Sequence, residues 1–143
     1  MEQQLHTVTL DKLDTCLTYC LRRIGLDREL CHYETYNEYF HQIPWNGRKK
    51  NLVVGSILLW DREIKWKWMP SHIDTTGRIE NRLIPTGFHF AVYEGDGLIS
   101  DTTRIHSIQP PSPSIRLRRL QHINKNPDWI LQYDPNWAQQ TDK

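Results

Sequence analysis

The sequence predicts an α+β domain, in which one or two helices near the N-terminus are followed by a run of strands. Apolar residues recur at three- and four-residue spacing from Leu10 to Ile24, which is typical of an amphipathic helix. Beyond residue 50 the pattern changes to short runs of branched and aromatic residues separated by Gly, Pro, Asp and Asn, which is typical of strands. With 143 residues and no internal repeat or linker, residues 1–143 are expected to form a single domain.

The first predicted helix, Leu10 to Ile24, has two alternative beginnings. Asp11 and Asp14 are both suitable N-cap residues, and Gly25 is placed to end the helix. A second, aromatic-rich helix is expected from Glu29 to Phe40, and a loop from Ile43 to Lys50 follows it.

Five segments then have the composition of strands. In chain order they are Asn51–Trp60, Lys65–Met69, Phe88–Glu94, Leu98–Thr103 and Trp129–Tyr133. Between them, Ser71–Gly87 is expected to form a surface excursion, part of which could pair as a strand. Gln109–Ser114 is rich in proline and is expected to be a stiff connector, whereas Ile115–Ile123 is ambiguous between helix and strand.

Charge and composition exclude some classes of partner. The 18 basic residues nearly balance the 17 acidic ones, so no global attraction to nucleic acid is expected. Tryptophans alternate with lysines from Lys65 to Met69, and a basic cluster runs from Arg116 to Arg119. Both features are also found in proteins that bind single-stranded nucleic acid. We expect instead that the tryptophans pack in a core while the lysines face water, so nucleic acid is not a predicted partner.

The sequence also bears on location. No apolar run is long enough to span a bilayer, and no N-terminal segment has the pattern of a signal peptide. We therefore expect no membrane partner and synthesis in the cytoplasm, with export by a signal-independent route left open. The three cysteines, Cys16, Cys20 and Cys31, are too few for a disulfide framework and indicate a reducing compartment with at least one free thiol.

Cys16 and His89 are the first candidates for chemistry. Cys16 lies at the edge of the apolar stripe of the first helix, whereas Cys20 lies within it and is the better buried, inert thiol. If the helix begins near Asp14, Cys16 lies in the first turn, where free N–H groups favour a thiolate and can hold an oxyanion. His89 begins a strand in which the small Ala91 lies on the same face and leaves space beside the imidazole.

The next strand contributes either Ser100 or Asp101, depending on its register. A two-residue turn at Asp96-Gly97 places Ser100 on the face of His89. A three-residue loop with a bulge instead places Asp101 within reach of His89, where a carboxylate would fix the imidazole tautomer. Local physics leaves both registers open.

The string HFAVYEGDGLISD, from His89 to Asp101, resembles the signature of NlpC-type peptidases and amidases, which belong to the papain-like superfamily. In that family a histidine opens a strand, a Gly-x-Gly turn follows, and a polar residue comes twelve positions after the histidine. That residue is usually a second histidine, and here it is Asp101. The resemblance therefore favours the register that brings Asp101 to His89.

Two upstream segments are similar to the same family. GSILLWD, from Gly55 to Asp61, resembles its Gly-Asp strand, with Ser56 in place of the Asp. DTCLTYCLRRIGL, which begins at Asp14, resembles its nucleophile helix, with Leu17-Thr18 in place of Ser-Gly. The resemblance implies a papain-like (NlpC-like) fold, in which an N-terminal nucleophile helix packs on a small antiparallel sheet.

The resemblance also implies a function. Cys16 would be the nucleophile, His89 the base and Asp101 the residue that orients the base, in a cysteine hydrolase cleaving an amide bond of a peptide through a thioacyl intermediate. The implied partner is a peptide or peptidoglycan-stem substrate, with no cofactor; no zinc-ligand spacing is present, and no metal is expected. Two alternatives stay open: transglutaminase-like acyl transfer by the same triad, and a non-catalytic binding module.

Overall fold

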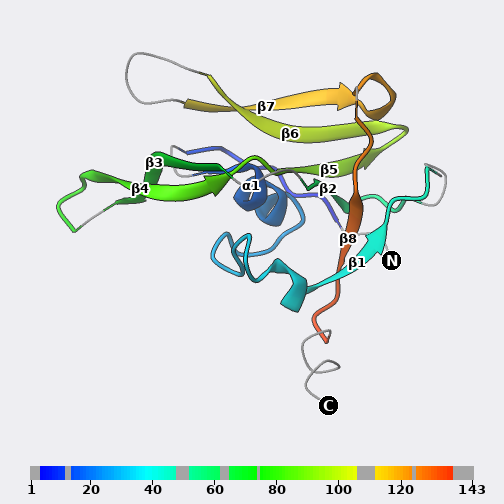
Figure 1. The fold of residues 1–143 in the computed structure, drawn as a ribbon, viewed down its shortest axis with the longest axis horizontal. Helices are drawn as coiled ribbons and strands as arrows, with labels where there is room; N and C mark the ends of the chain where they lie inside the picture. The colour runs from blue at the N-terminus through cyan, green and yellow to red at the C-terminus, as the bar shows by residue number, and fades with distance from the viewer. Residues whose placement is uncertain are drawn as a thin grey trace.

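The computed structural model of the chain describes residues 4–11, 14–47, 52–61, 65–73, 75–105, 112–123 and 125–136. Six antiparallel strands form one sheet in the order β1-β8-β2-β5-β6-β7, and two further strands, β3 and β4, form a separate ribbon (Figure 1). The strands are β1 (Phe40–Pro44), β2 (Ile57–Trp60), β3 (Lys65–Ile73), β4 (Ile79–Thr86), β5 (His89–Gly95), β6 (Leu98–Ile105), β7 (Ser112–Arg119) and β8 (Trp129–Tyr133). The helical elements are α1 (Cys16–Arg23) and two 3-10 turns, η1 (Tyr36–Glu38) and η3 (Leu120–His122).

The predicted α+β, papain-like fold class was wrong, because the chain is mostly antiparallel sheet. α1 is short and is the only α-helix in the described residues. A helix packed on a sheet is the one part of the prediction that is loosely compatible with the observed structure. The second helix expected from Glu29 to Phe40 is replaced by turns and η1. Aromatic, Thr, Asn and His residues are weak helix formers, and the Thr35 hydroxyl accepts the N–H of His32 at 2.9 Å, which stabilises a turn instead.

α1 begins later than the predicted Leu10, because a capping box closes its first turn. Thr15 is the N-cap, so neither Asp11 nor Asp14 has that role. The Thr15 hydroxyl accepts the N–H of Thr18 at 3.3 Å, and the Thr18 hydroxyl accepts the N–H of Thr15 at 2.8 Å.

Gly25 ends the helix as predicted. Its φ of 85° lies in the left-handed region that favours glycine. Its N–H donates to the carbonyl of Arg22 at 3.0 Å, and the N–H of Leu26 donates to the carbonyl of Leu21 at 2.8 Å, which is the Schellman arrangement.

Strand β2 runs through the centre of the core and is buried on both faces. Ile57 and Leu59 belong to the apolar cluster that includes α1, whereas Leu58 and Trp60 belong to a cluster on the opposite face. The first cluster also contains Leu17, Cys20, Leu21, Ile24, Phe90, Val92 and Leu131. The second also contains Ala91, Tyr93, Ile99, Leu120 and Ile130. The sheet therefore has a buried centre on each side, and α1 covers one of these sides next to β5 and β6.

The ribbon of β3 and β4 projects from one end of the sheet (Figure 1). The predicted strand at Lys65–Met69 is confirmed as part of β3, and the expected excursion Ser71–Gly87 contains β4 as its partner. The prediction that the two tryptophans pack in a core was wrong, since Trp66 is 55% exposed and Trp68 71% exposed. The alternating pattern found the strand correctly, but the ribbon carries these side chains away from both apolar clusters.

The remaining segments differ from expectation mainly at their ends. The predicted loop Ile43–Lys50 begins within β1, and residues 48–50 lie outside the described residues. The ambiguous segment Ile115–Ile123 is strand as far as Arg119 and then forms η3. Of the proline-rich connector, residues 109–111 lie outside the described residues, and β7 begins at Ser112. Among the described residues, no helix has the length and apolar character needed to cross a membrane.

Candidate active site

The hairpin of β5 and β6 combines features of both predicted registers. Asp96 and Gly97 have φ values of 54° and 77° and form a two-residue turn. A register shift between Tyr93 and Gly95 adds one residue to β5, so that beyond the shift Tyr93 pairs with Ile99. This bulge places Asp101 on the same side of the hairpin as His89.

Ser100 lies on the opposite side of the hairpin from Asp101. Its hydroxyl accepts a hydrogen bond from the Tyr19 hydroxyl of α1 at 2.7 Å and donates to Glu94 at 3.0 Å. Ser100 therefore connects the sheet to the helix, and Asp101 is the residue that meets His89.

Cys16 is the first residue of α1 and is half-buried. The chain just before it is held by the fully buried carboxylate of Asp14. The Asp14 carboxylate accepts hydrogen bonds from the guanidinium of Arg22 at 2.5 Å and from the hydroxyl of Thr18 at 3.0 Å. Of the first-turn N–H groups, that of Thr18 donates to the Thr15 hydroxyl, whereas those of Cys16 and Leu17 have no acceptor inside the helix and are the donors beside the Cys16 thiol.

His89 lies at the first position of β5 with its side chain 25% exposed. Its Nε2 is 2.7 Å from Oδ2 of Asp101, and the thiol of Cys16 is close enough to the imidazole to contribute to its raised pKa. Since Nε2 faces Asp101, Nδ1 is the ring nitrogen left to exchange a proton with the thiol. Burial alone would lower the pKa of His89, but its interactions with Asp101 and Cys16 outweigh burial and raise the pKa from 6.5 to about 9.

Asp101 is fully buried, and one of its carboxylate oxygens is hydrogen-bonded to three basic side chains. Oδ2 contacts His89 Nε2, the guanidinium of Arg116 at 3.2 Å and the guanidinium of Arg118. Burial raises the pKa of Asp101, but the hydrogen bonds and charges of His89 and Arg118 bring it below 3.8. The carboxylate is therefore ionised throughout the neutral pH range and holds the imidazolium form of His89.

Arg116 and Arg118 were not predicted to belong to this site, because the sequence indicates them only as part of a basic cluster. In β7, however, Arg116 pairs directly with Asp101 of β6, and the two-residue period of a strand places Arg118 on the same face. Leu117, between them, is 63% exposed on the other face. The alternating Arg-Leu-Arg pattern was the available signal, but it required the knowledge that β7 pairs with β6.

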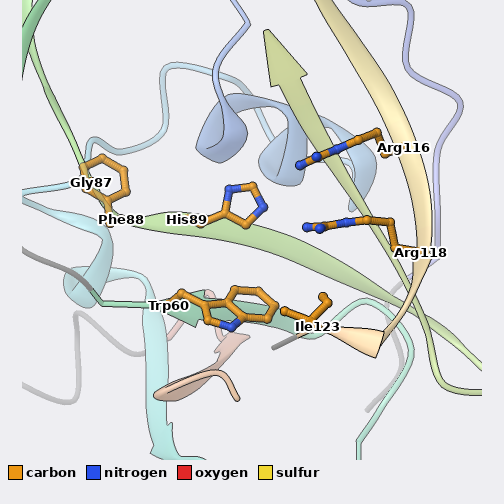
Figure 2. A pocket seen from close by; sticks show the side chains of 7 residues that line it. All are labelled: Trp60, Gly87, Phe88, His89, Arg116, Arg118 and Ile123. Carbon is orange, nitrogen blue, oxygen red and sulfur yellow. The ribbon is translucent and has the colours of Figure 1, made fainter. Parts of the chain in front are cut away.

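A pocket of about 310 Å³ opens beside His89. Figure 2 shows Arg116 and Arg118 extending from β7 towards His89, with Trp60 and Ile123 on the other side. The pocket is lined by Trp60, Gly87, Phe88, His89, Arg116, Arg118 and Ile123. A substrate placed in it would have one cationic wall and one apolar wall, with the imidazole between them.

The other two thiols lie in different surroundings. Cys20 is fully buried, and burial, reinforced by the charges of Cys16 and Asp101, raises its pKa well above the usual value. Burial also raises the pKa of the Cys31 thiol, to about 11. Cys16 is thus the most accessible thiol of the three, and it is the one that interacts with the imidazole of His89. The described residues contain no group of three or more His, Cys, Asp or Glu side chains placed to hold a metal ion.

No protein-family model, curated protein or solved structure matches the chain. An arrangement of thiol, imidazole and buried carboxylate is suited to nucleophilic catalysis where the imidazole can take the proton of the thiol and the carboxylate orients the imidazole.

Proposed function

We propose that the protein is a cysteine hydrolase that cleaves an amide bond in a peptide, with Cys16 as nucleophile, His89 as base and Asp101 as the group that orients the base. One observation carries the proposal: the imidazole of His89 is hydrogen-bonded to the buried carboxylate of Asp101, and the Cys16 thiol at the start of α1 is close enough to help raise the pKa of that imidazole. The proposal depends on these three side chains and not on the papain-like fold.

The proposed reaction begins from a thiolate–imidazolium pair, in which Nδ1 of His89 already holds the Cys16 proton. The thiolate then attacks the carbonyl carbon of the amide, and the oxyanion forms near the first-turn N–H groups of α1. His89 gives its proton to the departing amine, which leaves a thioacyl group on Cys16. Water attacks this thioester with His89 as base, releasing the acid and restoring the thiol. Asp101 stabilises the imidazolium form in both steps.

The proposed substrate class comes from the resemblance of the His89–Asp101 string to NlpC-type peptidases and amidases. It is a peptide of the kind found in bacterial cell-wall stems. Such a peptide presents an amide bond without a large folded partner, which suits a pocket of about 310 Å³ beside the base.

The test is hydrolysis of synthetic stem peptides, followed by chromatography and mass spectrometry of the products. Cys16→Ser should lower kcat/KM by about 1,000-fold or more, because serine is a much weaker nucleophile beside this base. Cys31→Ala is the matched control, since Cys31 is a buried thiol remote from the base, and it should keep kcat/KM at the wild-type level. An acid quench during turnover should leave the acyl group on Cys16.

Two results would contradict this proposal. If Cys16→Ser cleaves as fast as wild type, Cys16 is not the nucleophile. If an added primary amine takes up nearly all of the acyl group, the enzyme is an acyltransferase and not a hydrolase.

A further inference from the structure

One face of the ribbon formed by β3 and β4 is apolar and exposed. Trp68 of β3 pairs with Leu83 of β4, and Trp66 lies two residues from Trp68, so these three side chains share a face. The two-residue period of β4 places Asn81 and Ile79 on the same face. All five side chains are exposed, and together they form the tryptophan face of the ribbon.

The tryptophan face consists of uncharged side chains. Among the described side chains of β3 and β4, the charged ones are those of Lys65 and Glu80, and the strand period places both on the opposite face. A binding site for nucleic acid or another acidic partner would need basic groups on the tryptophan face. An uncharged face can instead meet a copy of itself, because no like charges are brought together.

The ribbon lacks the second layer against which a sheet normally packs. Of the described residues, those in the two apolar clusters all lie outside β3 and β4. The ribbon projects from one end of the six-stranded sheet and stands apart from both clusters (Figure 1). A two-stranded ribbon is only marginally stable in water, and a second layer on its apolar face stabilises it. The tryptophan face therefore has the character of a surface that a partner covers.

The exposed area of the tryptophan face determines how strong such a contact can be. The exposed parts of Trp66, Trp68, Leu83 and Ile79 amount to about 450 Å² of apolar surface per copy. Two such faces would bury about 900 Å², which is less than the roughly 1,200–2,000 Å² of stable, specific interfaces. A pair of copies held by this contact should therefore dissociate on dilution.

We propose that the tryptophan face docks on the same face of a second copy and forms a reversible, two-fold symmetric dimer. Each ribbon then supplies the second layer that the other lacks. Because both copies use the same face, the contact closes at two chains and does not extend into a filament. This inference does not rest on the proposed function, since none of the five residues belongs to the triad or lines the pocket.

The test is sedimentation equilibrium of the wild type and two variants. The wild type should pass from one chain to two between about 1 μM and about 1 mM, as expected for an interface of this size. Trp68→Lys should raise the dissociation constant at least about 100-fold, because each dimer loses two indoles and gains two like charges. Leu117→Lys is the matched control, since Leu117 is also a highly exposed apolar residue but lies on β7, and this variant should dimerise as the wild type does.

Three results of this experiment would overturn the proposal. The first is a wild type that remains a single chain up to about 1 mM. The second is a Trp68→Lys variant that dimerises as readily as the wild type, or a Leu117→Lys variant that is weakened to the same extent as Trp68→Lys. The third is growth beyond two chains, because a face that meets a different surface produces an open chain of copies.

A dilution series followed by NMR tests the wild type without substitution. The indole N–H signals of Trp66 and Trp68 should shift as the dimer dissociates. The signal of Trp60 should stay fixed, because Trp60 is buried and its indole donates to the carbonyl of Lys125 at 2.7 Å. Trp66 and Trp68 signals that do not change with concentration would overturn the proposal. So would a monomeric wild type whose Trp66 and Trp68 signals shift only on binding to vesicles of phosphatidylcholine and phosphatidylglycerol.

Discussion

Raising the pH from about 6 to about 10 should destabilise the protein by removing the proton from His89. The pKa of His89 is raised from 6.5 to about 9 in the folded protein, because its contacts with Asp101 and Cys16 outweigh the effect of burial. A raised pKa means that the folded state binds the proton more tightly than the unfolded state. The resulting stabilisation is fully present below about pH 6.5 and is lost as the pH rises through about 9. This interval of about 2.5 pH units corresponds to a loss of about 3 kcal/mol in the free energy of unfolding.

The assay is urea unfolding at a series of pH values, with His89→Gln as the matched variant. Glutamine does not titrate, so the variant should lack this loss, while groups other than the partners Cys16 and Asp101 still titrate as in the wild type. The difference between the two stability curves therefore reports His89 together with its coupling to these two partners. Curves that stay parallel within about 0.5 kcal/mol from about pH 6 to about pH 10 would refute the interaction of His89 with its charged partners.

Three substitutions test the packing and the helix start that position the site. Trp60→Ala should cost about 3–5 kcal/mol in the free energy of unfolding, because Trp60 is 1% exposed and donates a partly buried hydrogen bond. Trp68→Ala should cost less than about 0.5 kcal/mol, since Trp68 is 71% exposed on the ribbon; equal losses in urea unfolding would contradict this placement. Thr15→Ala should lower stability by about 1 kcal/mol through loss of the capping box, and Thr15→Ser should restore it. A Thr15→Ala variant as stable as wild type would mean that the cap does not hold the start of α1.

The register of the β5–β6 hairpin shows what local sequence can predict. The pair Asp96-Gly97 correctly predicted a two-residue turn, and that turn alone would have placed Ser100 beside His89. The bulge next to Glu94 reverses this outcome. Glu94 binds Ser100 within the hairpin and also Arg23 of α1, so the bulge is associated with a contact, that with Arg23, which is distant in sequence. Only the resemblance to a known family favoured the observed register before the structure was known.

Burial was harder to predict than secondary structure. The alternating pattern of β3 correctly indicated a strand, but Trp66 and Trp68 are exposed because no property of a single strand determines whether a second layer covers it. Arg116 and Arg118 were missed for a similar reason. Their contact with Asp101 exists only because β7 pairs with β6, and a segment that reads equally well as helix or strand does not reveal its partner.

Site-resolved alkylation of the three thiols tests the central claim most directly. Wild type and His89→Gln are treated with iodoacetamide at about pH 6, and each cysteine is followed by mass spectrometry. The proposed pairing predicts that Cys16 reacts at least about 100-fold faster than Cys20 and Cys31, and that most of this advantage disappears in His89→Gln, because the thiolate is the reacting species and His89 takes up its proton. If Cys16 reacts as slowly as the two buried thiols, or if His89→Gln leaves its rate unchanged, the protein does not use Cys16 and His89 as a nucleophile and its base.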